Sequence, residues 1–155
     1  MAGVLTASGR RRPIVLRAAI AALAATAFNL LLRDIVRAAA HVPDAFDPFT
    51  WPPIVVATLA GVAGGTVVYA VLRAFLGARA DRVFTIVASV LLIVSLITPI
   101  TLLWSSHSQY PGTTLLTVAS LEVMHISTAV AAIVALAGKR APKPTLIAAQ
   151  TEASI

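Results

Sequence analysis

The chain has 155 residues, of which 59% are hydrophobic and only 12% are charged. A soluble domain of ordinary composition carries about twice that share of charged residues. The chain has no cysteine, which excludes disulfides, thiol catalysis and cysteine-ligated metals. These values argue against a soluble globular domain.

The charge pattern points to a membrane rather than to nucleic acid. The net charge is +6, but the basic residues lie at the ends of long apolar blocks, where membrane topology uses them. No nucleic-acid-binding motif is present. No charged residue occurs at positions 48–72 or 83–121. A membrane span needs about 20 apolar residues, so the lipid bilayer is the first partner that the sequence predicts.

Four hydrophobic segments predict four membrane-spanning helices, at about residues 14–36, 53–76, 83–103 and 114–136. The second can begin at Pro53, because the first turn of a helix does not need the missing N–H. We therefore expect an all-α, four-transmembrane-helix bundle with up-down-up-down topology, formed by a single domain at residues 14–137. A basic tail (1–13) precedes it, and a tail without a strong pattern (138–155) follows it, which we expect to be disordered.

Proline-rich sequence joins the first two spans. The stretch AAHVPDAFDPFTWPP has four prolines, which rule out a continuous helix. Phe46, Phe49 and Trp51, together with Trp104 after the third span, are typical of anchors at the membrane interface. A lid over a binding site is the alternative interpretation of this loop.

The distribution of basic residues predicts the orientation. Ten of the 12 lie on one side of the four-span topology: Arg10, Arg11, Arg12, Arg17, Arg73, Arg79, Arg82, Lys139, Arg140 and Lys143. The positive-inside rule then places both termini in the cytoplasm. We expect the protein to lie in the plasma membrane. Arg10, Arg11 and Arg12 are also expected to attract anionic lipid headgroups, although setting the topology explains them equally well.

The first span has an alternative interpretation. A basic cluster, an apolar stretch and the small residues Ala38, Ala39 and Ala40 resemble a secretory signal with a cleavage site. Cleavage would leave three spans with the same loop orientation, so charge does not distinguish the two. The length of the segment and the arginines before the site, Arg33 and Arg37, favour a retained span.

Two patterns predict how the helices pack. Ala57, Gly61 and Gly65 are spaced four residues apart, so they share one face that lets another helix approach closely, within the chain or in a dimer. Pro99 should kink the third span near its outer end, with nearby hydroxyl groups satisfying the freed carbonyls. A structural kink and a gating hinge are both compatible with this proline.

Glu122 and His125 stand out within the apolar fourth span. They are three residues apart, so they share a helix face. Asn29 and Arg33 lie in the outer half of the first span, which an up-down bundle places beside the fourth. We expect these four residues to form one polar cluster, either as a structural lock between the two spans or as a binding site for a proton or a small ligand.

Metal binding and catalysis have little support. Glu-x-x-His is half of a di-metal helical motif, but the sequence offers no second copy. His41, Asp44, Asp47 and His107 could meet outside the membrane, which is a weak basis for a metal site. No nucleophile-elbow or phosphate-loop motif is present. We therefore predict no catalytic residues, no metal and no cofactor.

Several segments resemble a known family. These are Asn29 late in the first span, VVYAVLRAF at the end of the second, RVFTIVASVLLIVSLITPI as the third and EVMHISTAVAA in the fourth. They resemble uncharacterised four-span bacterial membrane proteins, common in actinobacteria, that are grouped as a domain of unknown function. The resemblance covers roughly residues 14–137. It implies a four-helix membrane fold with a Met-His pair, here Met124 and His125, and implies no activity.

Three functions are compatible with these patterns. The first is a non-enzymatic accessory or envelope-associated subunit that works with a membrane partner or as a homo-oligomer. The second is a small carrier or sensor that binds a proton or small ligand at the cluster around Glu122. The third, a membrane enzyme, is the least supported because no catalytic constellation is visible.

Overall fold

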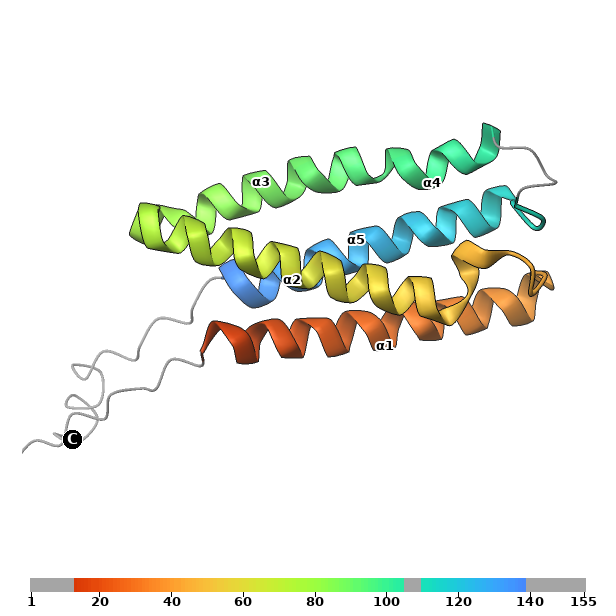
Figure 1. The fold of residues 1–155 in the computed structure, drawn as a ribbon, viewed down its shortest axis with the longest axis horizontal. Coiled ribbons are helices and arrows are strands. Elements are labelled where there is room, and N and C mark those ends of the chain that lie inside the picture. Colours follow the sequence, from red (N-terminus) through yellow and green to blue (C-terminus); the bar gives the residue numbers. More distant parts are fainter. Residues whose placement is uncertain (1–12, 105–109, 139–155) are drawn as a thin grey trace, which may run out of the picture.

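The protein is helical throughout the part of the chain that the computed structural model describes, residues 13–104 and 110–138, and no strand occurs there. Its α-helices are α1 (Ile14–Ala40), α2 (Trp51–Leu76), α3 (Ala80–Ser95), α4 (Ile97–Thr101) and α5 (Leu115–Ala137). Short 3₁₀ turns are η1 (Asp47–Phe49), η2 (Gly77–Arg79) and η3 (Leu102–Trp104). Figure 1 shows the long helices packed side by side.

Three helical segments are long and apolar enough to cross a membrane: Ile14–Ala40, Trp51–Trp104 and Leu115–Ala137. The middle segment has 54 residues. It contains the turn η2, where the chain reverses so that α3 packs back against α2 (Figure 1). Many large apolar side chains point away from the bundle, among them Leu23, Val56, Phe75, Ile93 and Val134. Such an apolar exterior suits a lipid environment rather than water.

The helix ends have local explanations in the sequence. The expected span over residues 14–36 continues to Ala40 and ends at His41, whose φ of 48° is left-handed. In α2, which begins at Trp51, prolines occupy the first turn, where no N–H is required. In front of α5, Thr114 and Thr117 form a reciprocal capping box. The helix is interrupted at Leu96, between α3 and α4.

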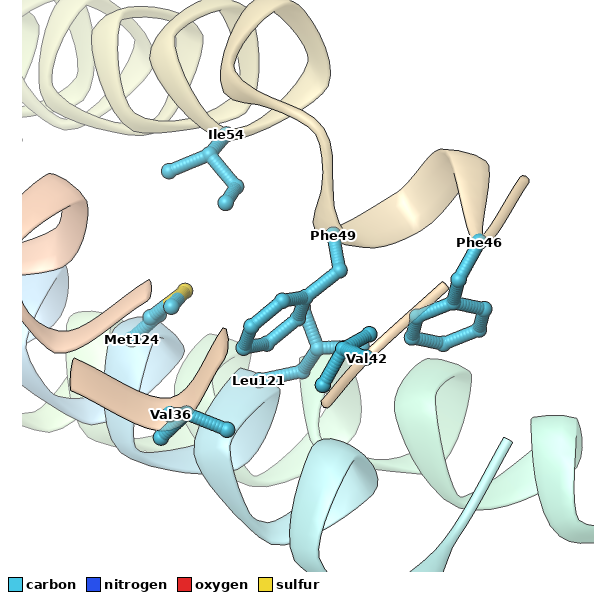
Figure 2. Close-up of a cluster of buried hydrophobic side chains, with 7 residues drawn as sticks. All are labelled: Val36, Val42, Phe46, Phe49, Ile54, Leu121 and Met124. Carbon is cyan, nitrogen blue, oxygen red and sulfur yellow. The ribbon is translucent and has the colours of Figure 1, made fainter. Parts of the chain in front are cut away.

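Helix α5 lies at the centre of the packing, because it contacts α1, α2, α3 and α4. Two apolar clusters hold the ends of the bundle. The turn-end cluster consists of Tyr69, Phe84 and Leu136, close to η2. The loop-end cluster consists of Val36, Val42, Phe46, Phe49, Ile54, Leu121 and Met124 (Figure 2). Along their helices, Asn29, Thr58, Ser127 and Thr128 lie between these two clusters.

The expectation that Phe46 and Phe49 are interface anchors is wrong. Both side chains are 0% exposed, and their rings stack with centroids 6.1 Å apart. The turn η1 folds residues 41–50 back over the end of the bundle, so that Phe49 points toward α1 and α5 (Figure 2). Trp51 and Trp104 are 61% and 78% exposed, and their role at the interface remains a prediction.

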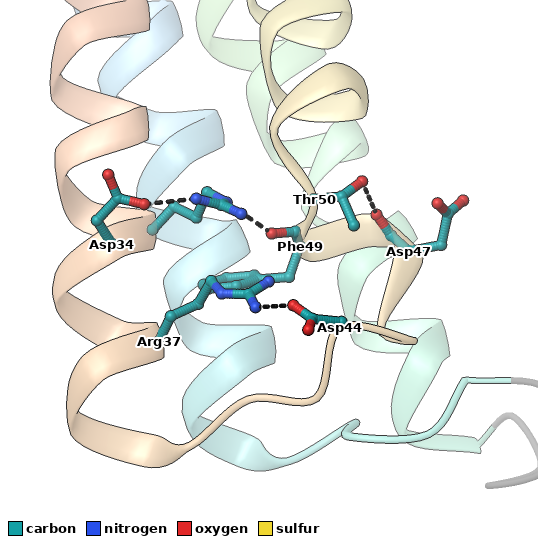
Figure 3. Close-up of polar contacts among 7 residues, drawn as sticks. Asp34, Arg37, Asp44, Asp47, Phe49 and Thr50 are labelled. Atoms are coloured by element: carbon teal, nitrogen blue, oxygen red, sulfur yellow. Dashed lines mark hydrogen bonds and ion pairs between the residues drawn. The ribbon is translucent and has the colours of Figure 1, made fainter.

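The 41–50 loop is held by polar contacts from α1 and within itself. The Arg33 Nε donates to the Phe49 carbonyl oxygen at 3.0 Å. Arg37 forms an ion pair with Asp44, and the Thr50 hydroxyl donates to the Asp47 carbonyl oxygen at 2.8 Å (Figure 3). The two arginines therefore fasten the loop whose phenylalanines fill the loop-end cluster.

The turn before α5 packs against the same loop at Gly112. This glycine has a φ of +98°, which side-chain-bearing residues rarely adopt. A Cβ atom at this position would lie 2.7 Å from the Pro43 Cδ and 3.3 Å from the Phe46 Cβ. The position therefore requires glycine both for its backbone conformation and for its contact with a rigid ring.

We expect Gly112→Ala to lower the free energy of unfolding by about 2 kcal/mol, because backbone strain at such a φ costs roughly 1–3 kcal/mol and the Pro43 ring has to move. Gly64→Ala is the matched control. Its Cβ would meet no atom within 4 Å, and alanine is the better helix former. Equilibrium unfolding in mixed detergent micelles measures both variants. Equal stability of Gly112→Ala and wild type would contradict the close packing of the two loops.

Candidate functional site

Asn29 joins three helices by hydrogen bonds between the two apolar clusters. This α1 residue is 1% exposed. Its Nδ2 donates to the Thr58 Oγ1 of α2 at 2.9 Å and to the Thr128 Oγ1 of α5 at 3.1 Å. Its Oδ1 accepts from the Ser127 Oγ of α5 at 2.5 Å. We call Asn29, Thr58, Ser127 and Thr128 the asparagine link.

The two threonines of the asparagine link donate their own protons within their helices. Thr58 donates to the Ile54 carbonyl oxygen at 2.7 Å, and Thr128 donates to the Met124 carbonyl oxygen at 2.8 Å. Ser127 has one hydroxyl proton, which the Asn29 Oδ1 accepts, and its Oγ also lies 2.9 Å from the Met124 carbonyl oxygen. Every hydroxyl proton and the amide group of Asn29 therefore have partners inside the protein, as a polar group in hydrocarbon requires.

The structure does not join Asn29, Arg33, Glu122 and His125 in the single polar cluster that the sequence suggested. Arg33 bonds to Asp34 and to the Phe49 carbonyl oxygen instead. The Glu122 Oε1 is buried and has no hydrogen-bond partner within the described residues. Arg33 is separated from the other three residues because its guanidinium group is bonded to the 41–50 loop.

The orientation of His125 fixes which ring nitrogen is free. The His125 Nδ1 lies 2.8 Å from the Leu121 carbonyl oxygen. A carbonyl oxygen can only accept, so the Nδ1 carries the proton. In the neutral ring the Nε2 is then an acceptor without a proton. The tautomer follows here from the hydrogen-bond geometry.

A groove of about 420 Å³ lies between α2, α3 and α5 and is open on one side. Small residues of α2 form one wall: Ala57, Ala60, Gly61, Gly64 and Gly65. Larger apolar residues of α3 form the facing wall: Phe84, Val87, Leu91 and Leu92. From α5 come Leu121, Met124, His125, Thr128, Ala129 and Ala132. Its volume lies within the roughly 300–1,000 Å³ of small-molecule sites, which are likewise mostly apolar.

The small-residue face of α2 serves both packing and the groove. A Cβ at Gly61 would lie 3.3 Å from the Thr128 Cγ2, so α2 and α5 approach closely there. A Cβ at Gly65 would meet Phe84 and Ala132 at ordinary contact distances of 3.8 and 3.9 Å. Gly61 is thus the position on this face where the space is tightest.

Pro99 is buried in α4, three residues beyond the interruption at Leu96. Because proline has no N–H, the Ser95 carbonyl four residues earlier loses its usual helical donor. The Ser95 hydroxyl donates to the Leu92 carbonyl oxygen at 2.8 Å, and Ser95 lines the groove. Whether this region bends during function remains a prediction.

Some of the predicted sites lie outside the described residues. The structure does not describe Arg10, Arg11 and Arg12, which were expected to attract anionic lipids. It also does not describe His107, one of the four residues considered for a metal site. Asp44 of that group is paired with Arg37. Within residues 13–104 and 110–138 no three metal-ligating side chains are close enough together to hold a metal ion.

A family profile matches nearly the whole chain. It covers residues 6–142 and describes DUF6069, a family of unknown function. The chain belongs to the DUF6069 family. This agrees with the resemblance to an uncharacterised family of unknown function, and membership supplies no activity. No curated protein matches the chain, and no solved structure does.

Sequence reasoning missed several residues that matter in this DUF6069 chain. Thr58, Ser127 and Thr128 were not selected, although a buried asparagine needs partners of this kind. A signal was present, because Ser127 and Thr128 follow His125 closely on the same span. The α3 wall of the groove gave no signal, since its residues are apolar like any lipid-facing surface.

We expect Asn29→Leu to lower the free energy of unfolding by about 2 kcal/mol, since it removes three side-chain hydrogen bonds worth on average about 0.6 kcal/mol each in membrane proteins. Phe28→Leu is the control, because Phe28 is exposed on the adjacent position of α1. Steric-trapping or detergent unfolding measures both. Equal stability of the two variants would show that the asparagine link does not hold the helices together.

Proposed function

We propose that this DUF6069 protein spans the plasma membrane four times, up-down-up-down, with both termini in the cytoplasm. The α2–α3 hairpin would supply two spans and α1 and α5 one each. The start of α1, the turn η2 and the end of α5 lie at the same end of the bundle (Figure 1). The Arg17 guanidinium, which donates to the Leu136 carbonyl oxygen at 2.8 Å, joins two of them. The excess of basic residues on these segments supports a cytoplasmic location.

The contacts of α1 favour its retention in the mature protein. Cleavage after Ala40 would remove Asn29 from the asparagine link. It would also remove Arg33 and Arg37, which hold the 41–50 loop. We further propose that Arg10, Arg11 and Arg12 attract anionic headgroups at the cytoplasmic surface, where each basic residue is worth about 1 kcal/mol.

Within this topology, we propose that the protein is a non-enzymatic carrier or sensor that takes a small apolar molecule from the bilayer into the groove between α2, α3 and α5. The observation that carries this proposal is the groove itself, which is apolar, elongated and lined by glycine and alanine on helices that are apolar enough to cross a membrane. Among the described residues, His125 is the one titratable residue that lines the groove, so no pair of acid–base groups is found there.

An accessory subunit that receives a partner's transmembrane helix is the second candidate. It is favoured by the exposed small residues Ala57, Ala60 and Gly64, because small residues allow close helix approach. The groove volume of about 420 Å³ falls in the range of small-molecule sites, which favours the small molecule.

The orientation can be tested by cysteine labelling, because the chain has no native cysteine. Ala45 in the 41–50 loop and Ala78 in η2 are both exposed. In intact cells a membrane-impermeant maleimide should label Ala45→Cys and should label Ala78→Cys only after permeabilisation. The reverse pattern would overturn the proposed orientation, and labelling of both from outside would overturn the hairpin of two spans.

Occupation of the groove can be tested by native mass spectrometry of protein gently extracted from its own membrane. Wild type should carry a defined small-molecule mass, and Gly64→Leu should lose it because the new side chain fills the groove. Gly64 has space for a side chain, since no atom lies within 4 Å of its Cβ position, and the variant should therefore fold.

Ala63→Leu is the matched control for this experiment, because Ala63 is exposed on α2 and does not line the groove. It should retain the bound mass. Loss of the mass from both variants, or from neither, would contradict a ligand in the groove. A bound polypeptide of fixed mass that Gly64→Leu releases would instead support the accessory-subunit candidate.

A further inference from the structure

We infer that the molecule in the groove is a neutral, elongated hydroxyl compound, an alcohol or a phenol, whose hydroxyl group donates a hydrogen bond to the His125 Nε2. This inference rests on the proposed function and specifies its ligand. It follows from the hydrogen-bond donors and acceptors of the groove that remain unpaired once all bonds within the protein are made.

The donors that line the groove are already used. The Asn29 Nδ2 donates its hydrogen bonds to Thr58 and Thr128. The hydroxyl groups of Thr58, Thr128 and Ser95 each donate to a carbonyl oxygen of their own helix. The ring proton of His125 is on the Nδ1 and goes to the Leu121 carbonyl oxygen. Within residues 13–104 and 110–138, the groove therefore offers a ligand no free side-chain donor.

The acceptors are not all used. The His125 Nε2 has a free lone pair in the neutral ring, and hydroxyl oxygens can accept more than one hydrogen bond. The imidazole nitrogen is the strongest of these acceptors. A ligand that complements this groove must bring the proton, so a hydroxyl compound fits and a pure acceptor such as an ether does not. Leaving the Nε2 unpaired against an acceptor would lose affinity.

Depth excludes a phospholipid headgroup as the source of the hydroxyl. His125 lies ten residues beyond the start of α5 at Leu115, which places it about 15 Å along the helix. The hydrocarbon core is about 30 Å thick, so His125 lies near its middle, far from the layer of headgroups. A headgroup hydroxyl does not reach this depth, whereas the hydroxyl group of an uncharged alcohol or phenol does.

The shape of the groove indicates an elongated ligand. On α3 its lining runs from Phe84 to Ser95, which spans about 16 Å of helix. This is close to the thickness of one leaflet, about half of the 30 Å core. A single long chain therefore fits the groove, with its hydroxyl group directed toward α5.

The test compares hexadecan-1-ol with its methyl ether, which has the same chain and lacks the donor. Each competes with an alkyl-pyrene for the wild-type protein in detergent micelles, followed by pyrene fluorescence. We expect the alcohol to bind about three- to tenfold more tightly, the range of one net hydrogen bond. If the wild-type protein binds the two compounds equally, or binds the ether more tightly, the inference is overturned.

The role of His125 is tested by His125→Phe, which keeps a ring and removes both nitrogens. The preference for the alcohol should disappear. A preference that persists would assign the hydrogen bond to another acceptor and overturn the inference. Imidazole ¹⁵N spectra give a second readout. The chain has three histidines, and the Nε2 signal that is missing from the spectrum of His125→Phe is assigned to His125. This signal should shift when the alcohol is added and should not shift when the ether is added.

Two further arms separate the remaining outcomes. Phosphatidylglycerol, whose headgroup carries hydroxyl groups, should not displace the alcohol, and displacement at similar concentration would overturn the neutral class of ligand. If Gly64→Leu blocks the alcohol and the ether equally and wild type shows no preference, the groove function stands and the hydroxyl inference fails. If no probe binds wild type and native mass spectrometry finds no bound mass, the proposed function itself fails.

Discussion

The hydrogen bonds of Asn29 are the constraint on which the helix arrangement depends. An amide in hydrocarbon has no water to satisfy it, so it must find partners on neighbouring helices. By bonding to Thr58, Ser127 and Thr128 it fixes the rotation of α1, α2 and α5 about their axes. That rotation leaves the adjacent small residues, such as Gly64 on α2 and Ala129 on α5, to line the groove against α3.

The groove exists because α3 is held at its ends and faces small side chains along its middle. Near η2 the Tyr69 hydroxyl donates to the Asp81 carboxylate at 2.7 Å, and the rings of Tyr69 and Phe84 meet edge to face at 5.2 Å. Toward the other end, α4 packs against α5. Between these contacts, glycine and alanine do not reach across to α3, which leaves the space open.

Arg33 and Arg37 of α1 stabilise a loop rather than a polar cluster between the helices. Arg33 and Arg37 fasten the 41–50 loop through Phe49 and Asp44. The two phenylalanines of this loop then close the end of the bundle as part of the loop-end cluster. This arrangement separates Arg33 from Glu122 and leaves His125 as the ionisable residue that faces the groove.

The sequence alone predicted the all-helical class and apolar segments long enough to cross a membrane, because long neutral blocks are a local property. Its short motifs resembled a family of unknown function, and the family match agrees. The sequence also marked Asn29, Glu122 and His125 as unusual, since polar groups are costly in hydrocarbon. Only the tertiary structure decided which contacts these and neighbouring residues make. It showed that Phe46 and Phe49 turn inward, that Arg33 bonds to the 41–50 loop and that the His125 Nδ1 faces the Leu121 carbonyl oxygen. These depend on helix rotation and on how a loop folds back, and both are set by contacts between residues far apart in the sequence.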